Sequence, residues 1–465
     1  MMTLSLAVRN LLRNRRRSLA TLLAMAIGSC SILLFGGYST NINYAMHTEY
    51  VQTGGHLQIQ HRDFYLYGSG NPTAYGIADY NRIIAAIQND QVLRNMVLVA
   101  TPTLQFGGIA GNYAASVSRT IVGNGFVAKD INRMRQWNDF NLRTSSPVFA
   151  LEGAPADAAI VGTGVARVLQ LCDALKMADC PKPEQEKKPD GAAIPDDIAR
   201  LSLQEATAAS ATAGASPRRI EVLAGNAQGT PNVTSLEVIR AEEQGFKELD
   251  EVYVMMHLAR TQQLIYGKAP PKVTSIILQL RHSDQIPEAL ARLAPILATF
   301  SASQPLAVLD FRTLNPFYVQ TIRLFDTIFG FIFALIGAIV LFTVSNTMNT
   351  AVVERTVEIG TLRAIGLRRA GIRRLFVTEG ALLGLCGAVL GVVLALVIAA
   401  IGNRMGLTWS APGGVVPLPL NLTVWGETRM MVGTTLGLIC IAILSAWWPA
   451  YRAARMNVVD ALRHV

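Results

Sequence analysis

The sequence lacks the short motifs that mark common enzyme active sites. No G-x4-GK[ST] phosphate-binding loop occurs, because Gly267-Lys268 is followed by alanine and lacks the upstream glycine. This absence excludes ATP hydrolysis by the P-loop route. The metalloprotease motif HExxH, the hydrolase motif GxSxG and a pair of CxxC motifs are also missing. We therefore expect that the chain is not an enzyme and itself holds no cofactor or metal ion.

Charged residues are scarce as well. They make up 16% of the 465 residues, whereas hydrophobic residues make up 51%. This balance indicates an integral membrane protein rather than a soluble enzyme. A net charge of +9 is also typical of nucleic-acid-binding proteins. Here, however, the arginines cluster beside apolar runs and not along a face with interleaved aromatics, so we expect no nucleic-acid partner.

The five cysteines are few and fall into two groups. Cys30, Cys386 and Cys440 lie in apolar runs, where we interpret them as buried small hydrophobes. Cys172 and Cys180 are eight residues apart in a region without apolar runs. If that region is extracytoplasmic, these two cysteines are candidates for a disulfide. Two free thiols remain the alternative, because spacing alone does not determine geometry.

Four apolar runs are long enough to cross a bilayer, at residues 19–38, 325–345, 381–402 and 430–450. The first run lacks a small-x-small cleavage site, which favours an uncleaved helix over a signal peptide. Residues 1–18 place leucines at helical spacing opposite basic residues. They predict an amphipathic helix on the inner membrane face.

Arginine clusters determine the expected orientation. Cytoplasmic loops of membrane proteins are enriched in Lys and Arg. This rule places residues 1–18, 350–374 and 451–465 in the cytoplasm, and residues 39–321 and 403–429 outside it. The expected fold is therefore a membrane α-helical protein with four transmembrane helices. A large α+β extracytoplasmic domain is inserted between helices 1 and 2.

Within residues 39–321, alternating strand and helix patterns predict an α+β domain, which is either single or split into two lobes. A helix is expected around Asp250–Tyr266. Residues of about 173–218, rich in Pro, Lys, Glu, Ala, Ser and Thr, predict a low-complexity insertion. His47, His56 and His61 lack ligand spacing, and we interpret them as surface or partly buried residues.

A short charged segment, ERTVEIGTLRAIG at Glu354–Gly366, lies between the second and third apolar runs. Ile359, Leu362 and Ile365 are spaced by three and form an apolar edge. Glu354 and Glu358 are four apart, which places like charges on one helix face. A glycine such as Gly366 suits the position just beyond a helix end. The pattern fits either a helix that docks on a partner or a solvated turn whose charges only set topology.

The charged segment and the residues that follow it, ERTVEIGTLRAIGLRRAGIRRLFVTEG, resemble the signature of the FtsX-like permeases. These are membrane subunits of ABC systems and include the macrolide exporter MacB and the lipoprotein-releasing permeases. The C-terminal PAYRAARMNVVDALR also resembles the end of that family. The resemblance covers the membrane part of the chain. Residues 39–321 resemble the family only loosely, and the low-complexity insertion of about 173–218 departs from the family pattern.

The resemblance implies a permease subunit that contacts a separate ABC ATPase through a coupling helix. ATP and Mg would then be bound by that partner, and a second permease subunit, as homodimer or heterodimer, would complete the assembly. The residues implied in coupling are Glu354, Arg355, Glu358, Ile359, Leu362, Arg363, Ile365 and Gly366. The implied location is the bacterial cytoplasmic (inner) membrane, where the protein would also contact membrane lipid.

The implied function is mechanotransmission, in which ATP-driven motion reaches the outer domain and drives export or efflux of a substrate from the periplasm or outer leaflet. The alternatives are lipoprotein extraction and FtsX-type control of cell-wall hydrolases. A periplasmic adaptor or a lipoprotein carrier would be the further partner. A receptor or scaffold that needs no ATP is the alternative from another class.

Two further features concern the membrane helices. Glu379 lies at the inner edge of the third apolar run, where an acidic residue is a functional candidate by default. It would otherwise reach the membrane surface or accept hydrogen bonds from a neighbouring helix. Small-x3-small patterns in the third and fourth runs predict close helix packing. Polar residues at the inner end of the second run predict interhelical hydrogen bonds; they are Thr343, Ser345, Asn346, Thr347 and Asn349.

Overall fold

The structure is a computed structural model that describes residues 2–13, 15–142, 147–177, 217–226, 228–301, 304–409, 418–419 and 421–457. The chain divides into two compact units. We call them the helical unit (Met1–Ala45, Phe317–Trp409 and Leu418–Val465) and the sheet unit (Met46–Pro316 and Ser410–Pro417). Helix α2 belongs to the helical unit up to Ala45 and to the sheet unit from Met46.

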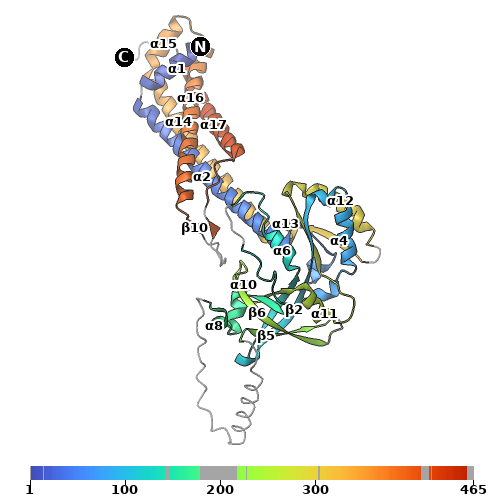
Figure 1. The fold of residues 1–465 in the computed structure, drawn as a ribbon. Helices are drawn as coiled ribbons and strands as arrows, with labels where there is room; N and C mark the ends of the chain where they lie inside the picture. Colours follow the sequence, from blue (N-terminus) through green and yellow to red (C-terminus); the bar gives the residue numbers. More distant parts are fainter. Residues whose placement is uncertain are drawn as a thin grey trace, which may run out of the picture. The chain divides into compact units, whose positions relative to one another are not determined.

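In the described part of the chain, the helical unit is built on four helices that are long and apolar enough to cross a membrane (Figure 1). Each contains one of the predicted apolar runs. Its elements are α1 (Met2–Arg13), α2 (Arg15–Gly54), α14 (Pro316–Glu354), α15 (Thr356–Ala364), α16 (Arg369–Arg404) and α17 (Thr428–Arg455), with the short strands β10 (Thr408–Trp409) and β11 (Leu418–Pro419).

Two predicted boundaries differ from the structure. The amphipathic helix ends at Arg13 instead of residue 18, and Arg15 already belongs to α2. Helix α2 also continues to Gly54, although the domain outside the membrane was predicted to begin at residue 39. No proline interrupts residues 39–54, and His47, Thr48 and Val51, at spacings of three and four, are buried, so this stretch keeps one packed helical face.

Glycines bring three of the long helices close together. A Cβ atom on Gly380 or Gly384 of α16 would lie within 3 Å of Ala446 or Ala442 of α17. Gly387 and Gly391, on another part of α16, approach α2 in the same way. The small-x3-small pattern of the third run therefore serves packing within the chain, as predicted.

Replacing Gly391 with alanine is expected to destabilise the helical unit by about 1–3 kcal/mol, because the new methyl group overpacks the α2–α16 contact. The added Cβ would lie 2.3 Å from Ser29 Cβ and 2.6 Å from the Ala26 carbonyl oxygen. Gly433→Ala in α17 is the matched control, since no atom lies within 4 Å of that Cβ position. Thermal unfolding of the detergent-solubilised chain measures both variants. Equal midpoints would contradict the expected overpacking.

Predicted burial of the cysteines is only partly confirmed. Cys30 is buried, whereas Cys386 and Cys440 are exposed on the outer faces of α16 and α17. Apolar composition alone does not distinguish the inner face of a membrane helix from its outer face, because both are apolar. Cys180 lies outside the described residues, as does most of the predicted insertion, so the Cys172–Cys180 disulfide stays a prediction.

Among its described residues, the sheet unit contains nine strands in the order β3-β7-β4-β6-β5-β2-β8-β1-β9. Strand β3 also pairs with β2, so six of the strands form a closed ring. The strands are β1 (Leu57–His61), β2 (Val97–Asn112), β3 (Val117–Phe126), β4 (Ala158–Gly162), β5 (Arg219–Gly225), β6 (Pro231–Glu242), β7 (Tyr253–His257), β8 (Ser275–Leu280) and β9 (Leu306–Asp310).

Strand β2 joins the two parts of this unit. Its first half pairs with β8, and its second half, from Leu104, pairs with β3. The unit is thus the predicted α+β arrangement with two parts. Its helices are α3 (Phe64–Tyr67), η1 (Pro72–Tyr75), α4 (Tyr80–Asn89), α5 (Leu93–Met96), η2 (Tyr113–Ala115), α6 (Ala128–Arg135), α7 (Thr163–Val168), α8 (Cys172–Leu175), α10 (Lys247–Asp250), α11 (Leu258–Tyr266), η3 (Ser283–Gln285), α12 (Ile286–Ala298) and α13 (Phe311–Leu314).

The helix predicted around Asp250–Tyr266 is wrong in its first half. Tyr253–His257 forms β7, which pairs in parallel with β3 and antiparallel with β4. Its central residues Val254 and Met256 are fully buried in the sheet core. Burial between two strands outweighs the helical tendency of this short apolar stretch.

The histidine prediction is also wrong for two of the three residues. His47 and His56 are almost completely buried. Their Nε2 atoms lie 2.8 Å and 3.0 Å from the Ser283 hydroxyl oxygen. His56 Nδ1 accepts a hydrogen bond from the Leu280 backbone N–H at 3.0 Å, so the neutral His56 ring carries its proton on Nε2.

Acid is expected to destabilise the sheet unit through His56. Burial, and then the neighbouring His47, lower the pKa of His56 to about 3. In the unfolded chain the pKa is about 6.5, so below that pH the unfolded state binds a proton that the folded state excludes. This contribution to stability is complete above pH 6.5 and is lost as the pH falls toward 3. At pH 5 the loss is about 2 kcal/mol.

The effect is measured by unfolding the chain in urea at pH 7 and at pH 5. Cleavage of the sheet unit by an added protease reports the unfolded fraction. The His56→Gln variant should be less stable at pH 7 but should lose less stability on acidification than the unaltered chain. An identical pH dependence for the two chains would contradict the assignment to His56.

Candidate functional site

The charged segment begins with a break between α14 and α15. Arg355 leaves the helical conformation there, with φ of −105° and ψ of 16°. Its side chain is buried and reaches Glu379 of α16, with Nη1 2.9 Å from Oε1 and 3.2 Å from Oε2. Glu379 is itself only 1% exposed. The predicted membrane-edge glutamate therefore accepts hydrogen bonds from a neighbouring helix and does not reach the surface.

Helix α1 completes this buried ion pair. The Asn10 side-chain amide donates to Glu379 Oε1 at 2.7 Å, and the Asn10 carbonyl oxygen accepts from Arg355 Nη2 at 3.1 Å. One cluster of polar groups thus joins α1, the α14–α15 junction and α16. A buried carboxylate is tolerated where charge and hydrogen bonds compensate its desolvation, as Arg355 and Asn10 do here.

Two further ion pairs surround the buried one. Arg13 of α1 lies 2.6 Å from Glu358 of α15, and Arg17 of α2 pairs with Glu354. The prediction that Glu354 and Glu358 share one helix face is wrong, because the break at Arg355 separates them into two helices. Both outer pairs are partly exposed, and such pairs contribute about 0–1 kcal/mol each.

The apolar edge of α15 is divided between core and solvent. Ile359 is 3% exposed, whereas Leu362 is 37% and Ile365 is 80% exposed. Gly366 adopts a φ of +105° just past the helix end, which is the role predicted for it. Arg363 donates from Nη1 to the Met456 carbonyl oxygen after α17. The segment is therefore anchored on one side and presents two apolar side chains on the other.

A groove of about 660 Å³ runs between α1 and α15–α16. Arg9 and Arg13 line it from α1, Val357 and Leu362 from α15, and Leu375 from α16. The described residues contain no group of three His, Cys, Asp or Glu side chains that could hold a metal ion. The groove thus presents cationic and apolar groups beside the single carboxylate of Glu358.

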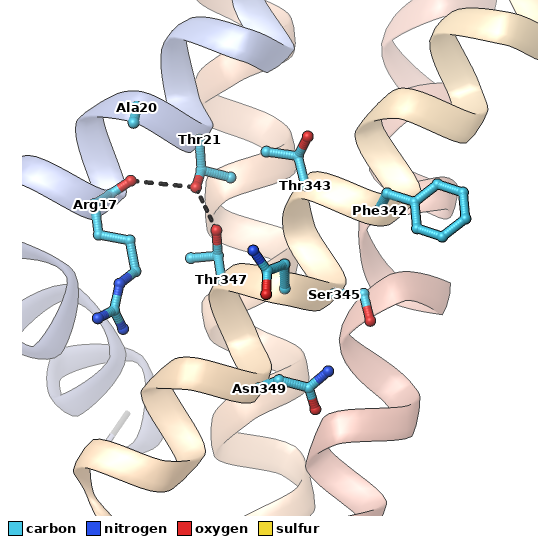
Figure 2. Close-up of a pocket in the computed structure, with 9 residues that line it drawn as sticks. Arg17, Ala20, Thr21, Phe342, Thr343, Ser345, Thr347 and Asn349 are labelled. Atoms are coloured by element: carbon cyan, nitrogen blue, oxygen red, sulfur yellow. Dashed lines mark hydrogen bonds between the residues drawn. The ribbon is translucent and has the colours of Figure 1, made fainter.

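A second groove, of about 630 Å³, lies between α2 and α14 (Figure 2). Thr21 of α2 and Thr347 of α14 form an interhelical hydrogen bond there, with 2.7 Å between their hydroxyl oxygens. The prediction that the polar end of the second run bonds between helices is therefore confirmed for Thr347 only. The side chains of Ser345, Asn346 and Asn349 line the groove and make no hydrogen bond within the described chain.

The structure brings Glu354, Arg355, Glu358 and Glu379 together around the ends of α1 and α2. Sequence reasoning missed Asn10, Arg13 and Arg17 as members of this site, because it assigned the basic N-terminus to an amphipathic helix on the membrane face. Four arginines in residues 13–17 and two glutamates in residues 354–358 were the available signal. Complementary charge does not reveal contact across more than 300 residues of chain.

Comparison with known proteins supports the resemblance for this part of the chain. Residues 327–458 match the family model described as FtsX-like permease C-terminal. The chain carries an FtsX-like permease domain. Most of α14 and all of α15, α16 and α17 belong to it, including Arg355 and Glu379. Helices α1 and α2 and the Met46–Pro316 part of the sheet unit lie outside the matched residues.

Several curated proteins are similar in sequence. LolC of Xylella fastidiosa, a lipoprotein-releasing system transmembrane protein, is 26% identical over 249 residues, which are 50% of this chain and 56% of LolC. An uncharacterized ABC transporter permease of Methanocaldococcus jannaschii is 32% identical, covering 28% of this chain and 30% of that protein. The macrolide export ATP-binding/permease protein MacB of Escherichia coli O157:H7 is 36% identical, covering 31% and 20%. The chain thus spans 56% or less of the length of these relatives.

Solved structures resemble the chain only weakly. The periplasmic region of MacB from Actinobacillus actinomycetemcomitans shares 10% identity with a TM-score of 0.31, covering 57% of this chain and 93% of that one. The extracellular domain of the transporter YknZ shares 14% identity with a TM-score of 0.29, covering 55% and 99%. These TM-scores are too low to establish a shared fold.

Proposed function

We propose that this chain is the membrane permease subunit of an ABC system and that α15 receives motion from a separate ATPase subunit. The observation that carries the proposal is the geometry of the charged segment. Arg355 and Glu379 hold its base rigidly, while Leu362 and Ile365 face away from the helical unit. A rigid helix with exposed apolar side chains suits docking in a groove of a partner protein.

The proposal extends to orientation. Arginine-rich residues at the start of α2, in α16 and at the end of α17 favour a cytoplasmic position for α15. In this arrangement the sheet unit is extracytoplasmic, in a bacterial inner membrane. Helix α2 would carry motion outward as a continuous helix of 40 residues. ATP and Mg would bind to the ATPase, and a second permease subunit would complete the complex.

The work done by the sheet unit would be export or efflux from the periplasm or outer leaflet, with an adaptor as further partner. Lipoprotein extraction is the second candidate. The alignment with LolC covers 50% of the chain, whereas the alignment with MacB of Escherichia coli covers 31%. A periplasmic lipoprotein carrier that binds the sheet unit would favour extraction over efflux.

Co-purification tests the proposal against an ATP-independent receptor. The full chain, expressed with an ABC ATPase subunit from the same organism, should retain that subunit and stimulate its ATP hydrolysis. Glu358→Ala combined with Arg363→Ala should uncouple stimulation while permease subunits still assemble. In intact cells, a thiol reagent that cannot cross the membrane should not label the Ile365→Cys variant at position 365. Strong labelling there, or no retained ATPase, would refute the proposal.

A further inference from the structure

The groove between α2 and α14 combines a cation with unused hydrogen-bonding groups. Arg17 pairs with Glu354 through Nη2, but its Nη1 atom is buried and has no partner within the described chain. On α14, the side chains of Ser345, Asn346 and Asn349 also line the groove and make no hydrogen bond to the described residues. In a bilayer these groups would face lipid, where unsatisfied polar groups are costly.

We propose that this groove binds the phosphate headgroup of an anionic phospholipid. A guanidinium with a free N–H edge is the side chain best suited to phosphate oxygens. The two asparagine amides supply N–H donors for the ester oxygens of the glycerol. This inference requires the helices to span a membrane, but it does not depend on coupling to an ATPase.

The depth of these groups along α14 agrees with the layers of a bilayer. At 1.5 Å per residue, Asn349 lies about 7.5 Å from Glu354, and Phe342 lies about 18 Å from it. The headgroup layer of one leaflet is about 5–8 Å thick. Asn349 and Arg17 therefore reach headgroup depth, while Phe342, which is 73% exposed, lies beside the acyl chains.

A second copy of the chain fits this groove less well. Two-fold symmetric contacts place the same surface of each subunit against itself. Groove-to-groove packing would bring the two Arg17 side chains and the neighbouring Arg15 and Arg16 of both copies together. An anionic headgroup instead supplies oxygen acceptors for the unpartnered Nη1 of Arg17, and basic residues near a membrane surface attract such lipids.

Lipid retention measures the inference directly. The full chain is reconstituted in nanodiscs of mixed phosphatidylglycerol and phosphatidylcholine, extracted, and examined by native mass spectrometry. Phosphatidylglycerol should remain bound preferentially, and Arg17→Gln should lower its retention about tenfold. Arg16→Gln removes the same charge from an exposed neighbour outside the groove and should behave as the unaltered chain. Equal retention by the two variants would overturn the assignment.

Further measurements distinguish a bound lipid from a second copy of the chain or free phosphate, and from a loss of folding. Asn349→Leu leaves the Arg17–Glu354 pair in place and should still reduce retention. A photo-crosslinking residue at position 346 should yield a lipid adduct, whereas a chain–chain adduct would show that a second copy fills the groove. Phosphatidylglycerol should raise the thermal unfolding midpoint of the chain in detergent. Equal protection by inorganic phosphate would show a free-phosphate site and overturn the lipid inference.

Discussion

Glu379→Ala is expected to lower the free energy of unfolding of the chain by about 3–5 kcal/mol, because it leaves the buried Arg355 guanidinium without a counter-charge. The ion pair is enclosed on both sides, with Arg355 6% and Glu379 1% exposed. The variant also removes the acceptor of the Asn10 amide and with it a hydrogen bond between α1 and α16. Thermal unfolding of the detergent-solubilised chain, with proteolysis at α1 as a second readout, measures the loss.

Two comparisons make this prediction specific. Glu358→Ala removes the carboxylate of an exposed pair, with side chains 60% and 48% exposed, and should change stability by no more than about 1 kcal/mol. The double variant Arg355→Met with Glu379→Leu removes both charges and should recover most of the lost stability. If Glu379→Ala and Glu358→Ala have equal effects, the buried pair does not hold the junction together.

Ile365→Asp is expected to weaken binding of the ATPase subunit about 30-fold, the effect of losing a contact worth about 2 kcal/mol at the centre of an interface. Ile365 is 80% exposed, so the folded chain should be as stable as before. Affinity of the purified chain for its ATPase subunit and stimulation of ATP hydrolysis are the measurements.

Ile365→Val is the control for this variant, because it keeps an apolar side chain at the same position. It should retain binding and stimulation within about threefold of the unaltered chain. If Ile365→Asp binds the ATPase subunit as well as Ile365→Val does, then α15 is not the docking element. The unfolding midpoint of Ile365→Asp, measured in parallel, distinguishes lost contact from lost folding.

The sheet unit shows which strands a local sequence pattern can predict and which it cannot. Local alternation is visible in β1 and β5, each of which has one buried and one less buried face. It did not predict β7, whose short apolar stretch Tyr253–His257 is compatible with either a strand or a helix. Pairing with β3 and β4 decides that case. The closed ring of strands likewise depends on the β2–β3 and β2–β5 pairings, which no single window of sequence contains.

The sequence by itself determined the features that depend on local composition. Four apolar runs, arginine-rich flanks and the charged segment ending at Gly366 all follow from residues close together in the chain. Only the tertiary structure decided which of these charges meet. It places Asn10, Arg355 and Glu379 in one buried cluster and leaves Ile365 exposed. The physical reason is that burial and pairing depend on which helices pack together, and that packing joins residues hundreds of positions apart.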